Sequence, residues 1–449
     1  MAVNNQFEKM IERPVEKLIP SLAVPTIISM LVTAIYNTAD TFFVSQINTS
    51  ASAAVGVVFS IMCILQALGF LFGMGAGSNL SRLLGQKNYK RASEVATSAI
   101  GITLILGVII AVTGMIFNRQ IVSVLGASET ILPYAQSYSM YIFVGTPFIC
   151  TSFVLNNIMR SQGRAVFSMI GLTMGGVLNI ILDPIFIFGL DMGIAGAAIA
   201  TLISQFIGFC VLFFFCLKKN DMVNIRLSSF TKNISIYADI IKMGFPSFMR
   251  QGLASIATIL LNKSAMVYGD AAVSAMSIVG RISFMMASVL LGFGQGFQPV
   301  VGFAYGAHKY GRVRKAFRFT VTVGITVLTV ISVFCFFMSH DIIAVFRKTD
   351  ADVIRIGTLA LKLQCATLFL QPITVIGNML LQSVGKPVEA TFASIARQGL
   401  FFIPLILMLP KFIGLYGVQI AQPVSDVISA LFCLYFIKKF FDEIPKEDE

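Results

Sequence analysis

The chain consists of long apolar runs separated by short polar segments, from residue 18 to residue 438. Each run exceeds about 20 residues, the length a helix needs to cross the hydrocarbon core of a membrane. Charges, glycines or prolines bound the runs and mark the connecting loops. The pattern predicts twelve spanning helices near 18–45, 52–80, 92–117, 130–158, 165–188, 194–217, 239–267, 272–302, 313–338, 352–381, 388–412 and 416–438.

Composition excludes a soluble protein, although 449 residues would otherwise suggest two or three soluble domains. The chain is 56% hydrophobic and only 12% charged, whereas soluble domains carry roughly 25% charged residues. The formal net charge of +12 comes from basic residues between the apolar runs. It therefore predicts basic cytoplasmic loops and contact with the lipid bilayer, and we expect no nucleic acid partner.

The distribution of Lys and Arg predicts the orientation of the chain. Basic residues concentrate in alternate connecting segments, for example after the second and the eighth span, at Arg82, Lys87, Lys309 and Arg312. The outer loops hold Arg119, Arg347, Lys348 and Lys411. Basic loops favour the cytoplasmic side. We therefore expect a multi-pass protein of the cell (inner) membrane, with both termini in the cytoplasm and no signal peptide at the N-terminus.

The two halves of the chain are related by an ancient duplication. When the sequence is slid over itself so that Pro25 meets Pro246, the same offset brings Gly73 onto Gly294 and, near the end of each half, Gly193 onto Gly414. Each half has six spans, so both halves insert in the same direction. We predict an all-α integral membrane fold of two six-helix lobes, related by pseudo-two-fold symmetry along the membrane normal. The predicted units are an N-lobe (1–217), a cytoplasmic linker (218–238), a C-lobe (239–438) and a cytoplasmic tail (439–449).

Acidic residues inside the spans are the strongest pointers to function, because a charge in the bilayer is costly and is rarely kept without a role. The first half has Asp40 and Asp183. Tyr36 lies four residues before Asp40, and Asn179 four residues before Asp183, so each pair shares a helix face. Further polar residues of these spans are Asn37, Asn156, Asn157, Thr201 and Gln205.

Two buried carboxylates with neighbouring amide and hydroxyl oxygens suit a hard cation. Without a metal ion, two nearby buried carboxylates cannot both stay ionised, so the pair can also take up a proton. Asp40 and Asp183 are therefore our candidate ligands for Na⁺ or acceptors for H⁺. The structural alternative is that each aspartate caps a helix end or lies at the membrane interface. Asp183 precedes Pro184, which keeps that alternative open.

The second half is different in charge. Its spans carry the basic residues Arg250, Lys263, Arg281, Lys362 and Arg397, and Asp426 is its one clearly internal acid. Long basic side chains near span ends can extend to the interface. The asymmetry assigns the cation site to the first lobe. Pro25 interrupts the first span and is a candidate hinge, although a fixed kink explains it equally well.

Several motifs are distributed over both halves of the chain: Gly73–Gly77 with Ser81–Gly85, Arg160–Gly163, Asn179–Pro184 with Ile187–Gly189, Gly193–Thr201, and Gln298–Pro299 with Tyr305–Ala307. Through these motifs the chain resembles the multidrug and toxic compound extrusion (MATE) family of transporters along essentially all twelve spans. The resemblance implies a V-shaped fold that exports organic cations and drugs against H⁺ or Na⁺. It also implies a coupling site at Asp40, Asn179, Asp183 and Thr201, with Asn156 or Asn157 from the fourth span. Tyr36 would line the adjoining drug cavity, and Pro25 matches a proline linked to helix bending.

The leading hypothesis is therefore a secondary antiporter that works by alternating access, with Asn37 and Gln205 beside Tyr36 in the substrate cavity. We expect a monomer that needs no cofactor beyond its coupling ion, since no ATP-binding motif is present. The main alternative is a lipid-linked oligosaccharide flippase of the same superfamily, suggested by the basic second half. A membrane-embedded enzyme is a third reading, but the spans offer no nucleophile–base pair for it.

Overall fold

The computed structural model describes residues 2–217, 222–346 and 350–445, which form helices with no β-strand in these ranges. A helix, or a helix pair, covers each predicted span. The bounds are α2 (Val15–Ser45), α3 (Thr49–Gly85), α4 (Tyr89–Ile116), α6 (Leu132–Ser161), α7 (Ala165–Pro184), α8 (Gly193–Cys216), α9 (Ile234–Met266), α10 (Asp270–Gly306), α11 (Tyr310–Phe337), α13 (Ala351–Leu368) with α14 (Gln371–Ser383), α15 (Pro387–Ile395) with α16 (Ile403–Ile413), and α17 (Leu415–Glu443).

These helices meet the length that a membrane requires. In the described part of the chain, ten are long and apolar enough to cross a bilayer, and α13 and α14 make an eleventh span that is bent by 51°. The remaining span, α9, has 33 residues but carries Arg250 and Gln251 near its centre, which makes it less apolar. The predicted all-α membrane fold is confirmed.

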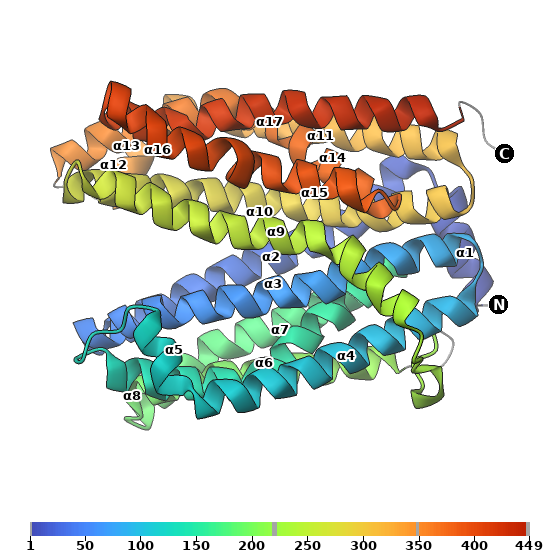
Figure 1. Cartoon of the computed structure of the whole chain (residues 1–449), viewed down its shortest axis with the longest axis horizontal. Helices are drawn as coiled ribbons and strands as arrows, with labels where there is room; N and C mark the ends of the chain where they lie inside the picture. The colour runs from blue at the N-terminus through green and yellow to red at the C-terminus, as the bar shows by residue number, and fades with distance from the viewer. Residues whose placement is uncertain (1, 218–221, 347–349, 446–449) are drawn as a thin grey trace.

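The helices form two lobes that meet at one end of the molecule (Figure 1). Helices α2 to α8 make the first lobe and α9 to α17 the second, and both termini lie at the end where the lobes converge. The contacts between lobes run mainly through α3 with α9, α2 with α10, and α3 with α10. At the opposite end the ribbons of the two lobes diverge. We call the converging end the termini side.

Glycines let the lobe backbones touch on the termini side. A Cβ atom on Gly75 of α3 would lie 2.0 Å from the carbonyl oxygen of Ile240 in α9, and one on Gly296 of α10 would lie 2.6 Å from Cα of Ala23 in α2. Gly75 and Gly296 are paired by the same offset that brings Pro25 onto Pro246. Small residues allow this kind of close helix packing within membranes. Each half of the duplicated chain therefore contributes one glycine contact to the interface between the lobes.

Some helices were not predicted. The N-terminal helix α1 (Ala2–Glu12) lies on the termini side, where its Gln6 donates to the carbonyl of Gln162 and Arg312 of α11 donates to the carbonyl of Met10. Two short helices outside the predicted spans, α5 (Asn118–Val124) and α12 (Ser339–Phe346), begin at residues that the duplication pairs with each other. The repeat found in the sequence therefore extends to these connecting helices.

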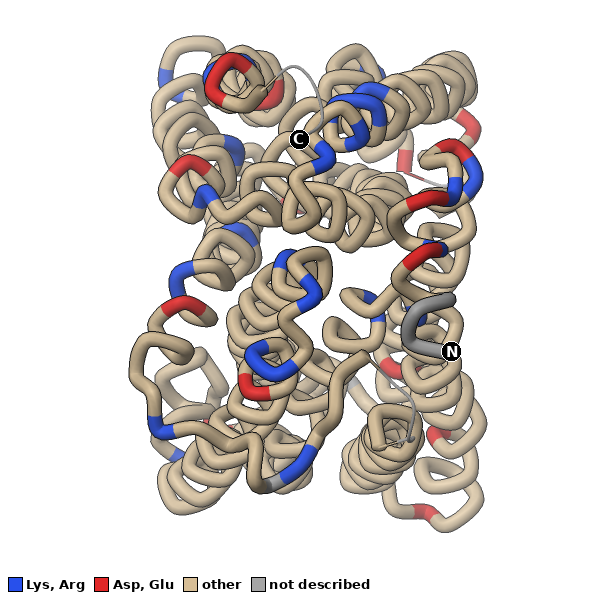
Figure 2. The backbone as a smooth tube through the Cα atoms, turned by 90° about the vertical axis from the view of Figure 1, so that its right-hand side faces the viewer, with Lys and Arg blue, Asp and Glu red and all other residues tan. Residues whose placement is uncertain are grey.

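The unit boundaries remain predictions, but the helix ends differ from some of them. Helix α9 begins at Ile234, inside the segment expected to be a linker, and α17 continues to Glu443, inside the expected tail. Residues 218–221 of the linker and 446–449 of the tail lie outside the described residues. Lys and Arg are spread over the termini side of both lobes (Figure 2).

Candidate functional site

Asp40 is held inside the first lobe by a tyrosine from another helix. It lies on α2, is 9% exposed, and accepts a 3.0 Å hydrogen bond at Oδ2 from the hydroxyl of Tyr138 on α6. Tyr138 is fully buried. Tyr138 was not among the residues predicted from the sequence, because a tyrosine in an apolar span more often packs against its neighbours than holds a functional carboxylate.

Asp183 belongs to a second group of polar side chains, which joins α7 to α8. The amide nitrogen Nδ2 of Asn179 donates to Asp183 Oδ1 at 3.1 Å and to Thr201 Oγ1 at 3.2 Å. All three side chains are buried, and Asp183 has no exposed surface. The four-residue spacing of Asn179 and Asp183 had predicted that they share a helix face, and their hydrogen bond shows that they do.

The two groups are connected into one chain of polar contacts. The hydroxyl of Tyr138 also interacts with Thr201, and Asp40 and Asp183 interact electrostatically. The contacts therefore run from Asp40 through Tyr138, Thr201 and Asn179 to Asp183. Four helices, α2, α6, α7 and α8, each contribute to this chain. We call these five residues the aspartate site.

Three oxygens of the aspartate site lack a hydrogen-bond donor among the described residues. They are Asp40 Oδ1, Asp183 Oδ2 and Asn179 Oδ1, each of them buried. A buried acceptor without a partner costs roughly 1–3 kcal/mol, and more if it is charged. A proton or a small cation would supply what these oxygens lack. The described residues contain no group of three or more His, Cys, Asp and Glu side chains that could hold a metal ion, so a metal ion here would also need neutral oxygens.

The aspartate site lies nearer the diverging end of the lobe than the centre of its helices. Asp40 is five residues before the last residue of α2, a rise of roughly 8 Å. Asp183 is followed directly by Pro184 and by the π-helix η1 (Ile185–Gly189). The burial of both aspartates nevertheless shows that protein, rather than bulk water, surrounds them.

Small residues bring the helices of the site close together. A Cβ atom on Gly175 of α7 would lie 3.1 Å from the carbonyl oxygen of Ser204 in α8, and Gly208 of α8 approaches Gly171 of α7 in the same way. A Cβ on Gly176 would meet Tyr36 of α2 at 3.1 Å. This close packing brings α2, α7 and α8 together around the site.

The residues predicted for the substrate cavity lie beside the aspartate site. Tyr36 and Gln205 are half-buried and their side chains interact with each other. Asn37 is also half-buried, and its carbonyl accepts a hydrogen bond from Thr41 within α2. Pro25 is buried in the same helix, on the termini side of the site. Their roles in binding and bending remain predictions.

Asn156 and Asn157 do not lie in the aspartate site, which corrects the expectation from sequence. Asn156 follows Tyr138 by eighteen residues on α6, a separation of roughly 27 Å along the helix. Its amide nitrogen donates instead to the carbonyl of Ser168 at 3.4 Å, and Asn378 donates in the same way to the carbonyl of Ala390. Each contact joins two neighbouring helices of its own lobe, α6 to α7 and α14 to α15, and Asn156 lies away from both aspartates.

Asn157 also lies on the termini side, away from Asp40 and Asp183. Its side-chain oxygen accepts a hydrogen bond from Arg160, and its amide nitrogen donates to the carbonyl of Phe153. Both expectations failed for the same reason. An amide in a span indicates a buried polar contact, but its depth along the helix decides whether it can reach a given carboxylate.

The internal acid of the second lobe is already neutralised. Asp426 is buried and accepts a 2.7 Å hydrogen bond from Nε of Arg397, which makes an ion pair. Gln364 and Gln422 also donate to its carboxylate, at 3.1 and 2.8 Å. Asp426 thus has partners on both oxygens, unlike the aspartates of the first lobe. This difference agrees with assigning the cation site to the first lobe.

Comparison with known proteins identifies the family. The sequence model of the family MatE matches residues 25–185 and again residues 246–408. The chain belongs to the MATE family. The first match begins at Pro25 and the second at Pro246, the two residues that the internal repeat brings together, which confirms the predicted duplication.

Individual MATE proteins match along nearly the whole chain. The multidrug export protein MepA of Staphylococcus saprophyticus is 30% identical over 423 residues, covering 94% of this chain and 93% of the relative. A solved multidrug resistance MATE family transporter of the MOP superfamily, in an outward-facing conformation, superposes with a TM-score of 0.92 at 26% identity, covering 97% of each chain. A MATE protein in the bent conformation gives a TM-score of 0.91 at 26% identity, covering 97% of each chain.

The resemblance inferred from the motifs is thus confirmed, and so is the two-lobed fold of the MATE family that it implied. The proteins matched are transporters, and this chain is a multi-pass membrane protein of the same kind.

Proposed function

We propose that this protein is a multidrug efflux antiporter, which exports organic cations and drugs in exchange for H⁺ or Na⁺. One observation carries the coupling part of the proposal: two buried aspartates belong to one chain of polar contacts and keep unpartnered oxygens. The drug-export part is supported by relatives named multidrug export proteins.

The mechanism follows from the charge of the aspartate site. When Asp40 or Asp183 is ionised and empty, its unpartnered oxygens favour a positive charge, from either the substrate or the coupling ion. Occupation by H⁺ or Na⁺ removes the negative charge that would hold a cationic drug. One charge moving through 100 mV releases roughly 2.3 kcal/mol, enough for about a fifty-fold concentration ratio.

The shape of the molecule supports alternating access. Backbone contacts at Gly75 and Gly296 close the termini side, and the lobes diverge at the other end (Figure 1). We propose that the termini lie in the cytoplasm, which the Lys and Arg on that side favour. The structure then corresponds to an outward-facing state of a multi-pass protein in the cell membrane.

Pro25 is the proposed hinge of α2. It is buried, and it cannot donate the backbone hydrogen bond that would stiffen the helix at this point. A solved relative is described in a bent conformation, which supports bending in the family. A fixed kink at Pro25 would instead leave transport unchanged when proline is replaced by alanine.

The experiment measures efflux of a fluorescent dye cation from proteoliposomes under a pH gradient alone and then under a sodium gradient alone. The wild type should respond to at least one gradient, and Asp40→Asn and Asp183→Asn should each abolish the response. Glu129→Gln is the matched control, since Glu129 is an exposed acid in the loop before α6. Full gradient-driven efflux by both aspartate variants would disprove the assigned coupling role.

The oligosaccharide flippase remains the alternative, and the same preparation can test it. Arg397, one of the basic residues that suggested it, is paired with Asp426, so it is less available to a pyrophosphate head group. A flippase would translocate a labelled lipid-linked sugar and would not accumulate the dye. An antiporter would show the opposite pattern.

A further inference from the structure

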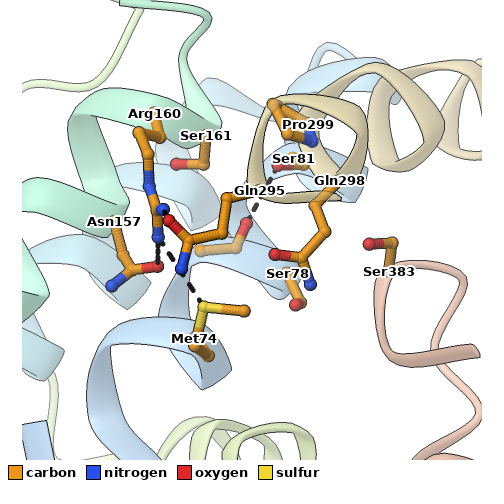
Figure 3. A pocket seen from close by; sticks show the side chains of 11 residues that line it. Met74, Ser78, Ser81, Asn157, Arg160, Ser161, Gln295, Gln298, Pro299 and Ser383 are labelled. Carbon is orange, nitrogen blue, oxygen red and sulfur yellow. Dashed lines mark hydrogen bonds between the residues drawn. The ribbon is translucent and has the colours of Figure 1, made fainter. Parts of the chain in front are cut away.

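A small polar cavity lies between helices of the two lobes (Figure 3). It is well away from the aspartate site, because Arg160 on its lining follows Tyr138 by 22 residues along α6. Its volume is about 20 Å³, which is room for one or two water-sized spheres. Helices from both lobes line it. The lining side chains used below are Met74 and Ser78 of α3, Arg160 of α6, Gln295 and Gln298 of α10, and Ser383 of α14.

Arg160 brings a positive charge into this cavity without a negative partner. It is 5% exposed and, in the described ranges, no carboxylate oxygen lies within 4.0 Å of its guanidinium. The guanidinium donates to neutral oxygens only, those of Gln295 from the other lobe and Asn157. A nitrogen of the same group lies 3.7 Å from the sulfur of Met74.

The polar groups on the lining that lack a hydrogen-bond partner also favour an anion, because they include donors. Nε of Arg160 and the hydroxyl of Ser383 are both buried and have no partner among the described residues. The hydroxyl of Ser78 and the amide of Gln298 lie on the same lining, and the lining contains no acid. A buried, unpaired charge costs several kcal/mol, so an anion that neutralises Arg160 would be stabilising.

From these observations we infer that the cavity is a binding site for a small monovalent anion, of the size of chloride. Room for one or two water-sized spheres suits an ion of this size. Arg160 supplies the charge, and the unpartnered hydroxyl of Ser383 lies on the far side of the same lining, in the second lobe (Figure 3). A water molecule could fill the same space, but it would leave the charge uncompensated.

The position of the site links anion binding to conformation. Arg160 and Ser78 belong to the first lobe, whereas Gln295 and Ser383 belong to the second, so the site exists only while the lobes are packed on the termini side. A ligand that binds one state alone shifts the equilibrium toward it. The anion therefore stabilises the closed termini side, independently of which ion drives transport at the aspartate site.

The duplication provides a mild variant for testing the charge. The turn at Arg160–Gly163 corresponds to the turn at Gln382–Gly385 in the second lobe, because Gly163 bonds to the carbonyl of Arg160 as Gly385 bonds to that of Gln382. The match is one residue beyond the offset that brings Pro25 onto Pro246, and it puts Gln382 in the place of Arg160. Gly163 and Gly385 both have positive φ, at 76° and 89°, so the same turn follows in each repeat. Glutamine is thus already accommodated at this place in the second lobe, and Arg160→Gln removes the charge with a side chain that the fold accepts.

The test is thermal unfolding of the purified full chain in chloride and in gluconate at equal ionic strength, followed by far-UV circular dichroism. Chloride should raise Tm saturably in the wild type and in Arg119→Gln, which removes an exposed arginine elsewhere. Arg160→Gln should lose the response. A wild type without a response, or Arg160→Gln with an unchanged one, overturns the inference.

A second variant keeps the test decisive if Arg160→Gln does not fold. Ser383→Ala retains the charge but removes the neutral donor, so the chloride concentration for half of the effect should rise about tenfold. An unchanged half-effect concentration contradicts the site. In crystals grown in bromide, an anomalous peak should lie between Arg160 and Ser383, and no peak there also overturns the inference. None of these readouts requires transport, so they are separable from the antiport proposal.

Discussion

The hydroxyl of Tyr138 donates a 3.0 Å hydrogen bond to Asp40 and thereby joins α6 to α2 in the interior of the first lobe. The same hydroxyl interacts with Thr201, which in turn accepts a hydrogen bond from Asn179 beside Asp183. Tyr138 is therefore the connection between two carboxylates that lie on different helices. The path of polar contacts between the two aspartates therefore runs through this tyrosine.

Tyr138→Phe should weaken coupling while the fold is kept. The substitution retains the ring and removes the donor, so Asp40 is left with no partner on either oxygen. A hydrogen bond to a charged group contributes roughly 1.5–3 kcal/mol. Its loss destabilises the empty, ionised carboxylate, so the affinity for the coupling ion should rise about tenfold to hundredfold and release of the ion should become harder. The measurement is dye efflux as a function of ion concentration in proteoliposomes.

The control for this prediction is Tyr141→Phe. Tyr141 is on the same helix and is half-buried, but it does not belong to the aspartate site. Its hydroxyl should be dispensable. Equal ion dependence in Tyr138→Phe and the wild type would show that the hydrogen bond has no part in coupling.

Thr201→Val should interrupt the chain of polar contacts between Asp40 and Asp183 with little loss of packing. Valine keeps the branched shape of threonine but cannot accept the hydrogen bond from Asn179 or interact with the Tyr138 hydroxyl. We expect ion affinity to fall by about tenfold. Thr201→Ser restores a hydroxyl and should restore most of the affinity, measured by the same efflux titration. Loss in both variants would point to packing instead.

The sequence revealed the aspartate site because a charge in an apolar span is conspicuous. Asp40 and Asp183 were found on that ground, and helical spacing added Asn179. Tyr138 was missed because its hydroxyl is only one small polar group on a large ring, and tyrosines are common in spans as packing residues. Asn156 and Asn157 were wrongly assigned to the site because a polar residue type does not show how far along the helix the residue lies from the aspartates.

The approximate positions of the spans could be predicted because they follow mainly from length and hydropathy. Features set by contacts between distant residues could not. Helix α1 contacts Gln162 and Arg312, which are far from it in the sequence. The bend between α13 and α14 occurs at residues 369–370, just before Pro372, in a run whose apolar character is continuous enough to predict one helix.

Asp426→Asn should reduce stability and leave the choice of coupling ion unchanged. Asp426 is buried against Arg397, whose Nε lies 2.7 Å from its carboxylate. Removing one charge of a buried pair leaves the other uncompensated and costs roughly 3–5 kcal/mol. The check is a lower Tm with the same response to pH and sodium gradients in dye efflux. A changed ion preference at unaltered Tm would instead place Asp426 in coupling.

Replacing both partners provides the compensating variant. Arg397→Met with Asp426→Leu removes the two charges together, so the penalty of an unpaired buried charge disappears. The Tm of the double variant should lie above that of Asp426→Asn. Because Gln364 and Gln422 also lose their acceptor, we do not expect the full stability of the wild type.

Gly75→Ala should disturb the contact between the lobes on the termini side. The added methyl carbon would lie 2.0 Å from the carbonyl oxygen of Ile240, which is backbone and cannot rotate away. Overpacking of this kind costs roughly 1–3 kcal/mol, and the cost is relieved if the lobes separate there. We therefore expect a lower Tm and more thiol labelling of a cysteine introduced at Ser81, a buried residue of the same interface.

Gly280→Ala is the matched control for this last prediction. Gly280 is also in a long spanning helix, α10, but a Cβ atom there would have nothing within 4 Å. Alanine should leave stability unchanged or raise it slightly, because it favours a helix over glycine by roughly 1 kcal/mol. If Gly75→Ala behaved like Gly280→Ala, the close packing of α3 on α9 would not be what holds the termini side closed.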